Sequence, residues 1–273
     1  MITVMLRLTP IALLIVAGCS GQMPANQANA AAPTPSEAPA PASAAAKPVT
    51  MDEKTDLLDF HLAWPAEVSA IPALEKTIRD PALAHKAELL KTAASDKADR
   101  EKQGFPFNAY DFSEDYEVAG DTPRLLSLTD TISEYTGGAH PNHGTKALLW
   151  DRDGGKTIAF TDLLDGGSAK LDGLFKSAYC AALDKERAKK REGMGGEAGA
   201  PDDPFNQCPK WSELALIPKG DAGKPMGTIL IHADPYVAGP YVEGDYDVEL
   251  PVTAAFIAAL KSEYRSSFAA QPQ

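Results

Sequence analysis

The spacing of apolar residues divides the chain into helical and extended segments. In residues 57–65 apolar side chains occupy every second position up to a proline, which predicts a strand. In residues 71–102 they recur every three or four positions, which predicts a long helix with Asp80 as the N-cap of its stronger part. The same spacing predicts helices at residues 168–192 and 253–268.

The other apolar runs alternate with polar residues in the manner of strands. Residues 108–122 and 124–138 predict two strands joined by a turn rich in glycine, aspartate and proline. Shorter strands are expected within residues 144–164, 211–220, 225–234 and 246–252. Because the helices fall in blocks between groups of strands, we predict an α+β fold: a mainly antiparallel sheet with helices packed on it, in two subdomains of one compact unit.

The first 48 residues differ in composition from the rest. Arg7 precedes an apolar run and a group of small residues ending at Cys19, which is the layout of a secretory signal. The segment "VAGC", residues 16–19, is similar to a bacterial lipobox, in which the cysteine is lipidated and begins the mature chain. We therefore expect a signal peptide at residues 1–18 and an alanine- and proline-rich tether at residues 19–48. An ordinary cleaved signal with a chance cysteine is the alternative.

This N-terminus predicts a lipoprotein held by its lipid on the periplasmic side of the bacterial envelope. Ser20 after the cysteine favours the outer membrane. The formal net charge of −12 argues against nucleic acid as a partner and is compatible with a cationic one. In an exported protein the remaining cysteines, Cys180 and Cys208, are expected to form a disulfide. A two-cysteine metal site is the alternative, but no histidine lies near either cysteine in the sequence.

Two stretches contain the main candidates for catalysis, metal binding or recognition. They are "YTGGAHPNHG" at residues 135–144 and "DPYVAGPYVEGDYDVELP" at residues 234–251. The motifs GxSxG, HExxH and GxxxxGK do not occur in the sequence. In the first stretch Pro141 lies between His140 and His143, so the two histidines do not share a helical face. The tyrosines of the second stretch suit either a recognition surface or the cover of a sheet edge.

Three interpretations of the first stretch stay open. Gly137 and Gly138 suit a tight turn with positive φ, which leaves the histidines at the surface. A metal site needs further ligands, and the nearest residues of suitable type are Glu134, His232 and Glu243. A catalytic role needs a nucleophile and an oxyanion donor besides a histidine base.

Together these stretches resemble a known family. "YTGGAHPNHG", "GKTIAFTDLL" and "PYVAGPYVEGDYDVELP" are similar to the motifs of the RsiV-like extracellular domain family, and "FHLAWPAEVSAIPALEKTIRD" is similar to its companion N-terminal subdomain. The departures are Pro141 and Asn142, which lengthen the first turn, and the insertion around residues 193–208. The family occurs in the lysozyme-binding anti-sigma factor RsiV and in the accessory region of the peptidoglycan deacetylase PdaC. The resemblance therefore implies a tethered envelope module.

We expect an N-terminal α+β subdomain at residues 49–134 and an RsiV-like C-terminal subdomain at residues 135–273. The expected function is non-enzymatic binding of peptidoglycan or of a cationic wall-active protein such as lysozyme, without a cofactor. The candidate contact residues are Tyr135, Gly137, Gly138, His140, His143, Tyr236, Tyr241 and Glu243. The alternative is a metal-dependent hydrolase acting on cell-wall glycan or peptide, which predicts zinc that is lost when His140 and His143 are replaced by alanine.

Overall fold

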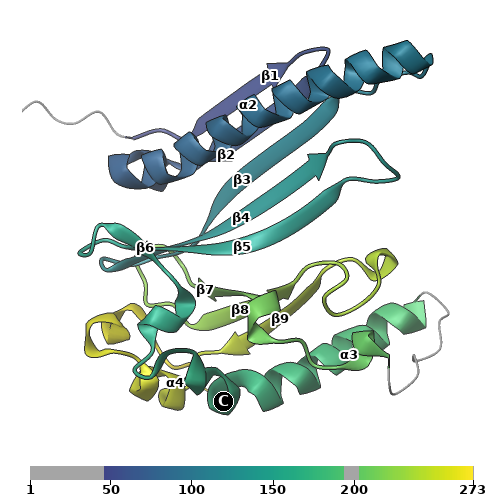
Figure 1. Cartoon of the computed structure of the whole chain (residues 1–273). Coiled ribbons are helices and arrows are strands. Elements are labelled where there is room, and N and C mark those ends of the chain that lie inside the picture. The colour runs from purple at the N-terminus through teal and green to yellow at the C-terminus, as the bar shows by residue number, and fades with distance from the viewer. Residues whose placement is uncertain (1–45, 194–202, 273) are drawn as a thin grey trace, which may run out of the picture. The chain divides into compact units, whose positions relative to one another are not determined.

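The computed structural model describes residues 46–193 and 203–272 (Figure 1). The predicted signal peptide, the lipidation site at Cys19 and almost all of the tether lie outside these ranges. No helix within them is long and apolar enough to cross a bilayer.

Six strands form the larger sheet, in the order in which they occur along the chain. They are β1 (Val49–Lys54), β2 (Leu58–Trp64), β3 (Tyr110–Asp121), β4 (Leu125–Tyr135), β5 (Asn142–Asp151) and β6 (Lys156–Ile158). Neighbours are antiparallel except β2 and β3, because the chain crosses between these two through α1 (Ala66–Ser69) and the long helix α2 (Pro72–Gln103). The long helix and the first three predicted strands are therefore confirmed.

Alternation along these strands sends apolar side chains to both faces of the larger sheet. Phe60 and Phe112 are buried on the face that packs against α2, in one cluster with Ile78 of that helix. Leu125 and Leu149 belong instead to a second core, on the other face. Figure 1 shows the same division, with α2 on one side of the larger sheet and a smaller sheet on the other.

The smaller sheet contains three antiparallel strands, β7 (Ala215–Lys219), β8 (Thr228–Ala233) and β9 (Tyr246–Pro251). Two helices, α3 (Ser177–Gly193) and α4 (Ala254–Ala259), pack against it. Tyr179 of α3 and Phe256 of α4 are buried in one cluster with Ile231 and Val248 of the strands. The predicted α+β fold with mainly antiparallel sheets is confirmed.

Cys180 of α3 and Cys208 form the predicted disulfide, with their Cα atoms 5.6 Å apart. The bridge ties the segment before β7 to α3, and part of the intervening insertion lies outside the described residues. By restricting the unfolded chain, such a cross-link stabilises the fold by about 3–4 kcal/mol in the chain-entropy model.

Two predicted helices begin differently from the prediction. Asp80 lies inside α2 and does not cap it, because the helix already starts at Pro72, a residue type that suits the first helical position. The helix predicted at residues 168–192 opens with a 3-10 turn, Gly167–Lys170, and a π-helical turn, Asp172–Lys176, before α3 begins.

The helix predicted at residues 253–268 is interrupted. After α4 the chain is extended at Leu260 and then forms a 3-10 helix, Ser262–Ser267. Leu260 is fully buried and forms an isolated β-bridge with Leu164. A tertiary contact therefore overrides the local helical pattern at this position.

The N-terminal strand β1 was not predicted, because it is an edge strand whose side chains are largely polar and exposed. The boundary expected between residues 134 and 135 falls at the end of β4, which pairs with β5 from Leu125–Asp151 to Glu134–Asn142. Buried residues still form two clusters, one between α2 and the larger sheet and one around the smaller sheet.

Candidate functional site

The loop between β4 and β5 meets the loop between β8 and β9. His140 of the first loop stacks on Tyr241 of the second, with ring centroids 3.9 Å apart and planes inclined by 20°. The Tyr241 hydroxyl donates a hydrogen bond of 3.2 Å to the carbonyl of Pro141. The two stretches that stood out in the sequence therefore form one surface.

Tyr236 adjoins this stack, since its ring centroid lies 5.7 Å from that of Tyr241 and its plane is tilted by 33°. We call Tyr236, Tyr241 and His140 the aromatic platform. Tyr236 is 58% exposed and the neighbouring Val242 is 77% exposed, so this surface is open to solvent. Tyr236 also has a φ of 70°, a conformation that costs a non-glycine residue about 1–3 kcal/mol and that the surrounding structure must maintain.

The glycines of the first loop have the predicted backbone conformation, with φ of 98° at Gly137 and 115° at Gly138. The Tyr135 hydroxyl donates to the Gly138 carbonyl at 3.2 Å. All three residues line a cavity of about 170 Å³ together with Arg100 of α2. Tyr135, Gly137 and Gly138 thus shape the loop and border this cavity, and they are not part of the aromatic platform.

Three basic side chains of α3 hold the second loop in place. Arg187 donates from Nε to the carbonyl of Ala238 at 2.9 Å, and Lys190 donates to the carbonyl of Glu243 at 2.8 Å. Arg191 pairs with the Glu243 carboxylate at 2.9 Å, and that carboxylate is only 8% exposed. Glu243, expected at the contact surface, is therefore an internal anchor of the loop.

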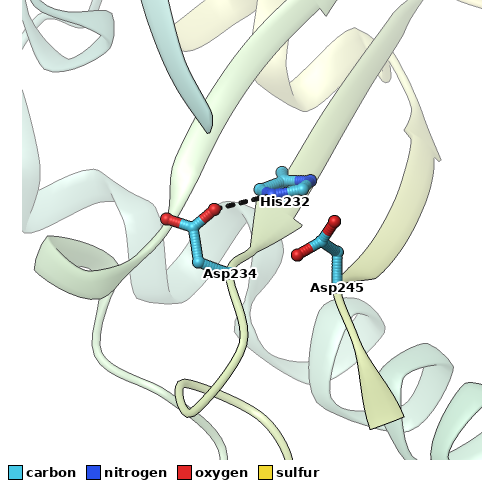
Figure 2. A group of neighbouring side chains, drawn as sticks. All are labelled: His232, Asp234 and Asp245. Atoms are coloured by element: carbon cyan, nitrogen blue, oxygen red, sulfur yellow. Dashed lines mark hydrogen bonds and ion pairs between the residues drawn. The ribbon is translucent and has the colours of Figure 1, made fainter. Parts of the chain in front are cut away.

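A cluster of carboxylates and imidazoles lies at the base of this loop. His232, at the end of β8, donates from Nδ1 to Asp247 at 2.7 Å and from Nε2 to Asp234 at 3.0 Å. Asp245 comes from the neighbouring chain segment, and Figure 2 shows its carboxylate directed toward the same ring. The ring of His143 contacts the Asp245 carboxylate at 3.1 Å. We call these five residues the His232 cluster.

The charge of His232 is set by its carboxylate neighbours. Burial lowers its pKa, but the hydrogen bonds and charges of Asp234 and Asp247 outweigh burial and raise the pKa to about 9. In return, the hydrogen bond from His232 lowers the pKa of Asp247. Without a further ligand, the imidazole is therefore protonated at neutral pH.

The metal ligands expected from the sequence do not form one site, although His143 and His232 both belong to the His232 cluster. His140 donates from Nδ1 to the Pro141 carbonyl at 2.9 Å, and the rings of His140 and His143 both lie against Tyr241. Glu134 bonds to His85 of α2 at 2.5 Å. Among the described residues, the ligand-type atoms that lie close enough to share an ion belong to His232, Asp234 and Asp245, all within 4.8 Å of one another.

A cleft of about 440 Å³ lies between β5 and β7. Its lining includes Lys146, Phe160, Trp211 and Asp234. Because Asp234 also bonds to His232, the cleft borders the His232 cluster. Its volume is in the range of pockets that hold small ligands.

The aspartates of the His232 cluster were missed in the sequence, although their pattern contains a signal. His232 lies in β8 and Asp234 directly follows that strand, whereas Asp245 directly precedes β9 and Asp247 lies in it. In the antiparallel pair, His232 lies opposite Asp247. A register prediction for these two strands would have brought the four side chains together.

Two solved structures have a partly similar chain trace. The structure is similar to that of a DUF3298 family protein from Pseudomonas aeruginosa, at 13% identity and a TM-score of 0.48, covering 83% of this chain and 98% of that one. It is also similar to a DUF3298 family member from Bacteroides fragilis, at 15% identity and a TM-score of 0.45, covering 80% and 94%. No curated protein matches the chain in sequence.

A family model supports the resemblance at the level of sequence. The model is described as Deacetylase PdaC, and it matches residues 51–143. This range begins within β1, includes α2 and β2 to β4, and ends at the start of β5, so it contains the first of the two loops. The predicted resemblance to RsiV-like and PdaC-associated domains is therefore confirmed, with residues 51–143 as the part that matches the PdaC model.

Proposed function

We propose that this chain is a non-enzymatic binding protein of the cell envelope. Its contact surface would be the aromatic platform, and its ligand a cationic wall-active protein such as lysozyme. The observation that supports this most is the convergence of two loops, far apart in the sequence, on one exposed surface of stacked rings.

The chemistry of this surface suits a cationic protein. Exposed tyrosines provide apolar area and a hydroxyl at small entropic cost, and their ring faces attract ammonium and guanidinium groups. Asp245 lies next to the platform with its side chain 37% exposed, and the net charge of −12 favours approach of a positive partner.

The backbone at Tyr236 supports a role in recognition. A strained residue at an exposed position reduces stability, and strain of this kind is concentrated at functional sites. The loop that contains Tyr236 is anchored from below by Arg187, Lys190 and Arg191. Such anchoring lowers the cost of ordering the loop when a ligand binds.

Location is part of the proposal. A lipid at Cys19 and a tether over residues 19–48 would hold the platform in the compartment that contains the cell wall. Peptidoglycan is the other ligand found there, and its sugar rings would also stack on tyrosine. The acidic charge of the chain favours the cationic protein over this glycan.

Calorimetry with lysozyme tests the proposal at low and at physiological salt, where attraction between exposed charges is screened over about 8 Å. We expect saturable one-to-one binding that persists at the higher salt. The double variant Tyr236→Ala, Tyr241→Ala should bind at least tenfold more weakly. Phe105→Ala is the matched control, because Phe105 is an aromatic residue that is 61% exposed elsewhere on the surface.

Two outcomes count against the proposal. Binding that is absent, or that disappears at physiological salt, would exclude lysozyme as the ligand. Sedimentation with purified peptidoglycan would then test the other wall component with the same three proteins. Unchanged lysozyme binding by the double variant would instead place the contact surface away from the platform.

A further inference from the structure

The His232 cluster has the composition and geometry of a metal site. We propose that His232, Asp234 and Asp245 bind one divalent transition-metal ion of the zinc type at the base of the loop between β8 and β9. This inference does not depend on the proposed ligand of the aromatic platform. The role of the ion would be structural, since the three residues join the two ends of the loop that contains Tyr236 and Tyr241.

The distances between the ligand atoms suit such an ion. Two ligands bonded to zinc at about 2.0–2.1 Å in a tetrahedral arrangement lie about 3.3 Å apart. Nε2 of His232 and Oδ1 of Asp234 are 3.0 Å apart, so a shift of a few tenths of an ångström would admit an ion between them. The Asp245 carboxylate completes a group of three within 4.8 Å, which small side-chain rotations would close around the ion.

Neighbouring residues already orient these ligands. Asp247 accepts a hydrogen bond of 2.7 Å from Nδ1 of His232, which leaves Nε2 as the nitrogen directed at Asp234. A carboxylate on the outer nitrogen is the usual second partner of a metal-bound histidine. The backbone N–H of Thr145 donates a hydrogen bond of 2.8 Å to Oδ1 of Asp234, and Nε2 of His143 lies 3.1 Å from Oδ1 of Asp245. All three ligands therefore have outer partners that fix their orientation.

The charges also favour a divalent ion. Three carboxylates, those of Asp234, Asp245 and Asp247, surround His232. Lys190 offsets only one of these negative charges, because its ammonium group lies close by and donates to the backbone carbonyl of Asp245. One imidazole with carboxylate oxygens is a donor set that suits zinc and similar ions, whereas calcium and magnesium prefer oxygen ligands alone.

A second histidine of the chain provides a matched control. His61 lies between two carboxylates in the same way, with Nδ1 at 2.6 Å from Asp52 and Nε2 at 3.0 Å from Asp115. In the described part of the chain, however, His61 does not belong to a group of three ligand-type residues close enough to share an ion. Its side chain is also 35% exposed, against 7% for His232.

The test is calorimetric titration of the untagged, chelator-treated chain with zinc chloride, and separately with calcium chloride. We expect one zinc ion per chain and much weaker binding of calcium. His232→Asn and Asp245→Asn should each weaken zinc binding at least tenfold, whereas His61→Asn should leave it unchanged. Asp245→Asn also serves where His232→Asn fails to fold, because Asp245 is partly exposed and its backbone contacts remain.

Thermal unfolding gives a second readout that does not depend on calorimetry. At one zinc concentration, zinc should raise the melting temperature of the parent chain and of His61→Asn equally, and that of Asp245→Asn by clearly less. No saturable zinc binding, or equal binding by the parent and both cluster variants, would overturn the proposal. Equal loss in His61→Asn would overturn it as well, because zinc would then bind histidines without selectivity. Lysozyme binding is measured independently, so either proposal can fail alone.

Discussion

Two histidines of this chain make the same pair of hydrogen bonds in different surroundings. His61 lies in β2 with one aspartate on each neighbouring strand, and solvent reaches a third of its side chain. His232 lies at the end of β8 with its aspartates on the same chain segment and on β9, and it is almost completely buried. The hydrogen-bond pattern is therefore not what separates the two sites. Burial and the third carboxylate, Asp245, separate them.

The difference in burial changes how much each histidine and its aspartates contribute to stability. The hydrogen bond to Asp52 is the largest influence that raises the pKa of His61, and water screens the charges there. At His232 burial opposes the charge, and the two aspartates must offset that cost before they raise the pKa. Removing the imidazole should therefore reduce the free energy of unfolding more at His232 than at His61.

The largest effect is expected from alanine at the two positions. His232→Ala removes a buried imidazole and leaves the half-buried Asp234 without this partner, which should reduce the free energy of unfolding by about 2–3 kcal/mol even though Asp247 is exposed. His61→Ala removes exposed ion pairs and should cost less than about 1 kcal/mol. Urea unfolding of the metal-free chains measures both values, and equal losses would show that burial does not distinguish the sites.

At a buried carboxyl without an ion-pair partner, substitution should raise stability instead of lowering it. Asp130 of β4 is buried beside Glu114, and its Oδ1 has no hydrogen-bond partner among the described residues. Burial first, and then the charge of Glu114, raises the pKa of Asp130 to about 7, while Lys146 opposes this shift. The Tyr116 hydroxyl donates to Glu114 at 2.7 Å, and its hydrogen bonding also opposes the rise in the pKa of Asp130 without cancelling it.

The raised pKa predicts how stability depends on pH. The folded chain holds the proton of Asp130 more tightly than the unfolded chain, so this contribution is complete below the ordinary value of 3.8 and is lost as pH rises through about 7. Asp130→Asn should therefore stabilise the fold by about 1–2 kcal/mol at pH 8 and change little at pH 4. Urea unfolding at both pH values measures the difference, and a loss of stability at pH 8 would contradict the assignment.

The smallest effect is expected at the junction of the two loops beside His232. Tyr241→Phe removes one exposed hydrogen bond to Pro141 but keeps the ring that stacks on His140. Stability should fall by no more than about 0.5 kcal/mol. Lysozyme affinity should change less than twofold, because the ring face makes the proposed contact. A large loss of affinity in calorimetry would assign recognition to the hydroxyl instead.

Local features of the fold were predictable because they depend on neighbouring residues. The alternation in β2, β3 and β4 and the helical spacing in α2 each reflect one element and the face that it buries. Gly137 and Gly138 indicated positive φ for the same reason. The strand β1 escaped prediction because an exposed edge strand has little apolar periodicity, and the helix after Thr253 was overestimated because only a distant residue, Leu164, holds Leu260 extended.

The sequence by itself determined the strands other than β1, the long helix, the disulfide pair and the two stretches that now form the candidate site. Only the tertiary structure decided that His140 stacks on Tyr241 and that Glu243 faces inward onto Arg191. It also decided that Asp245 joins His232, which no local pattern indicates. The physical reason is that propensities act over a few residues, whereas these contacts depend on strand register and on how the smaller sheet packs against the larger one.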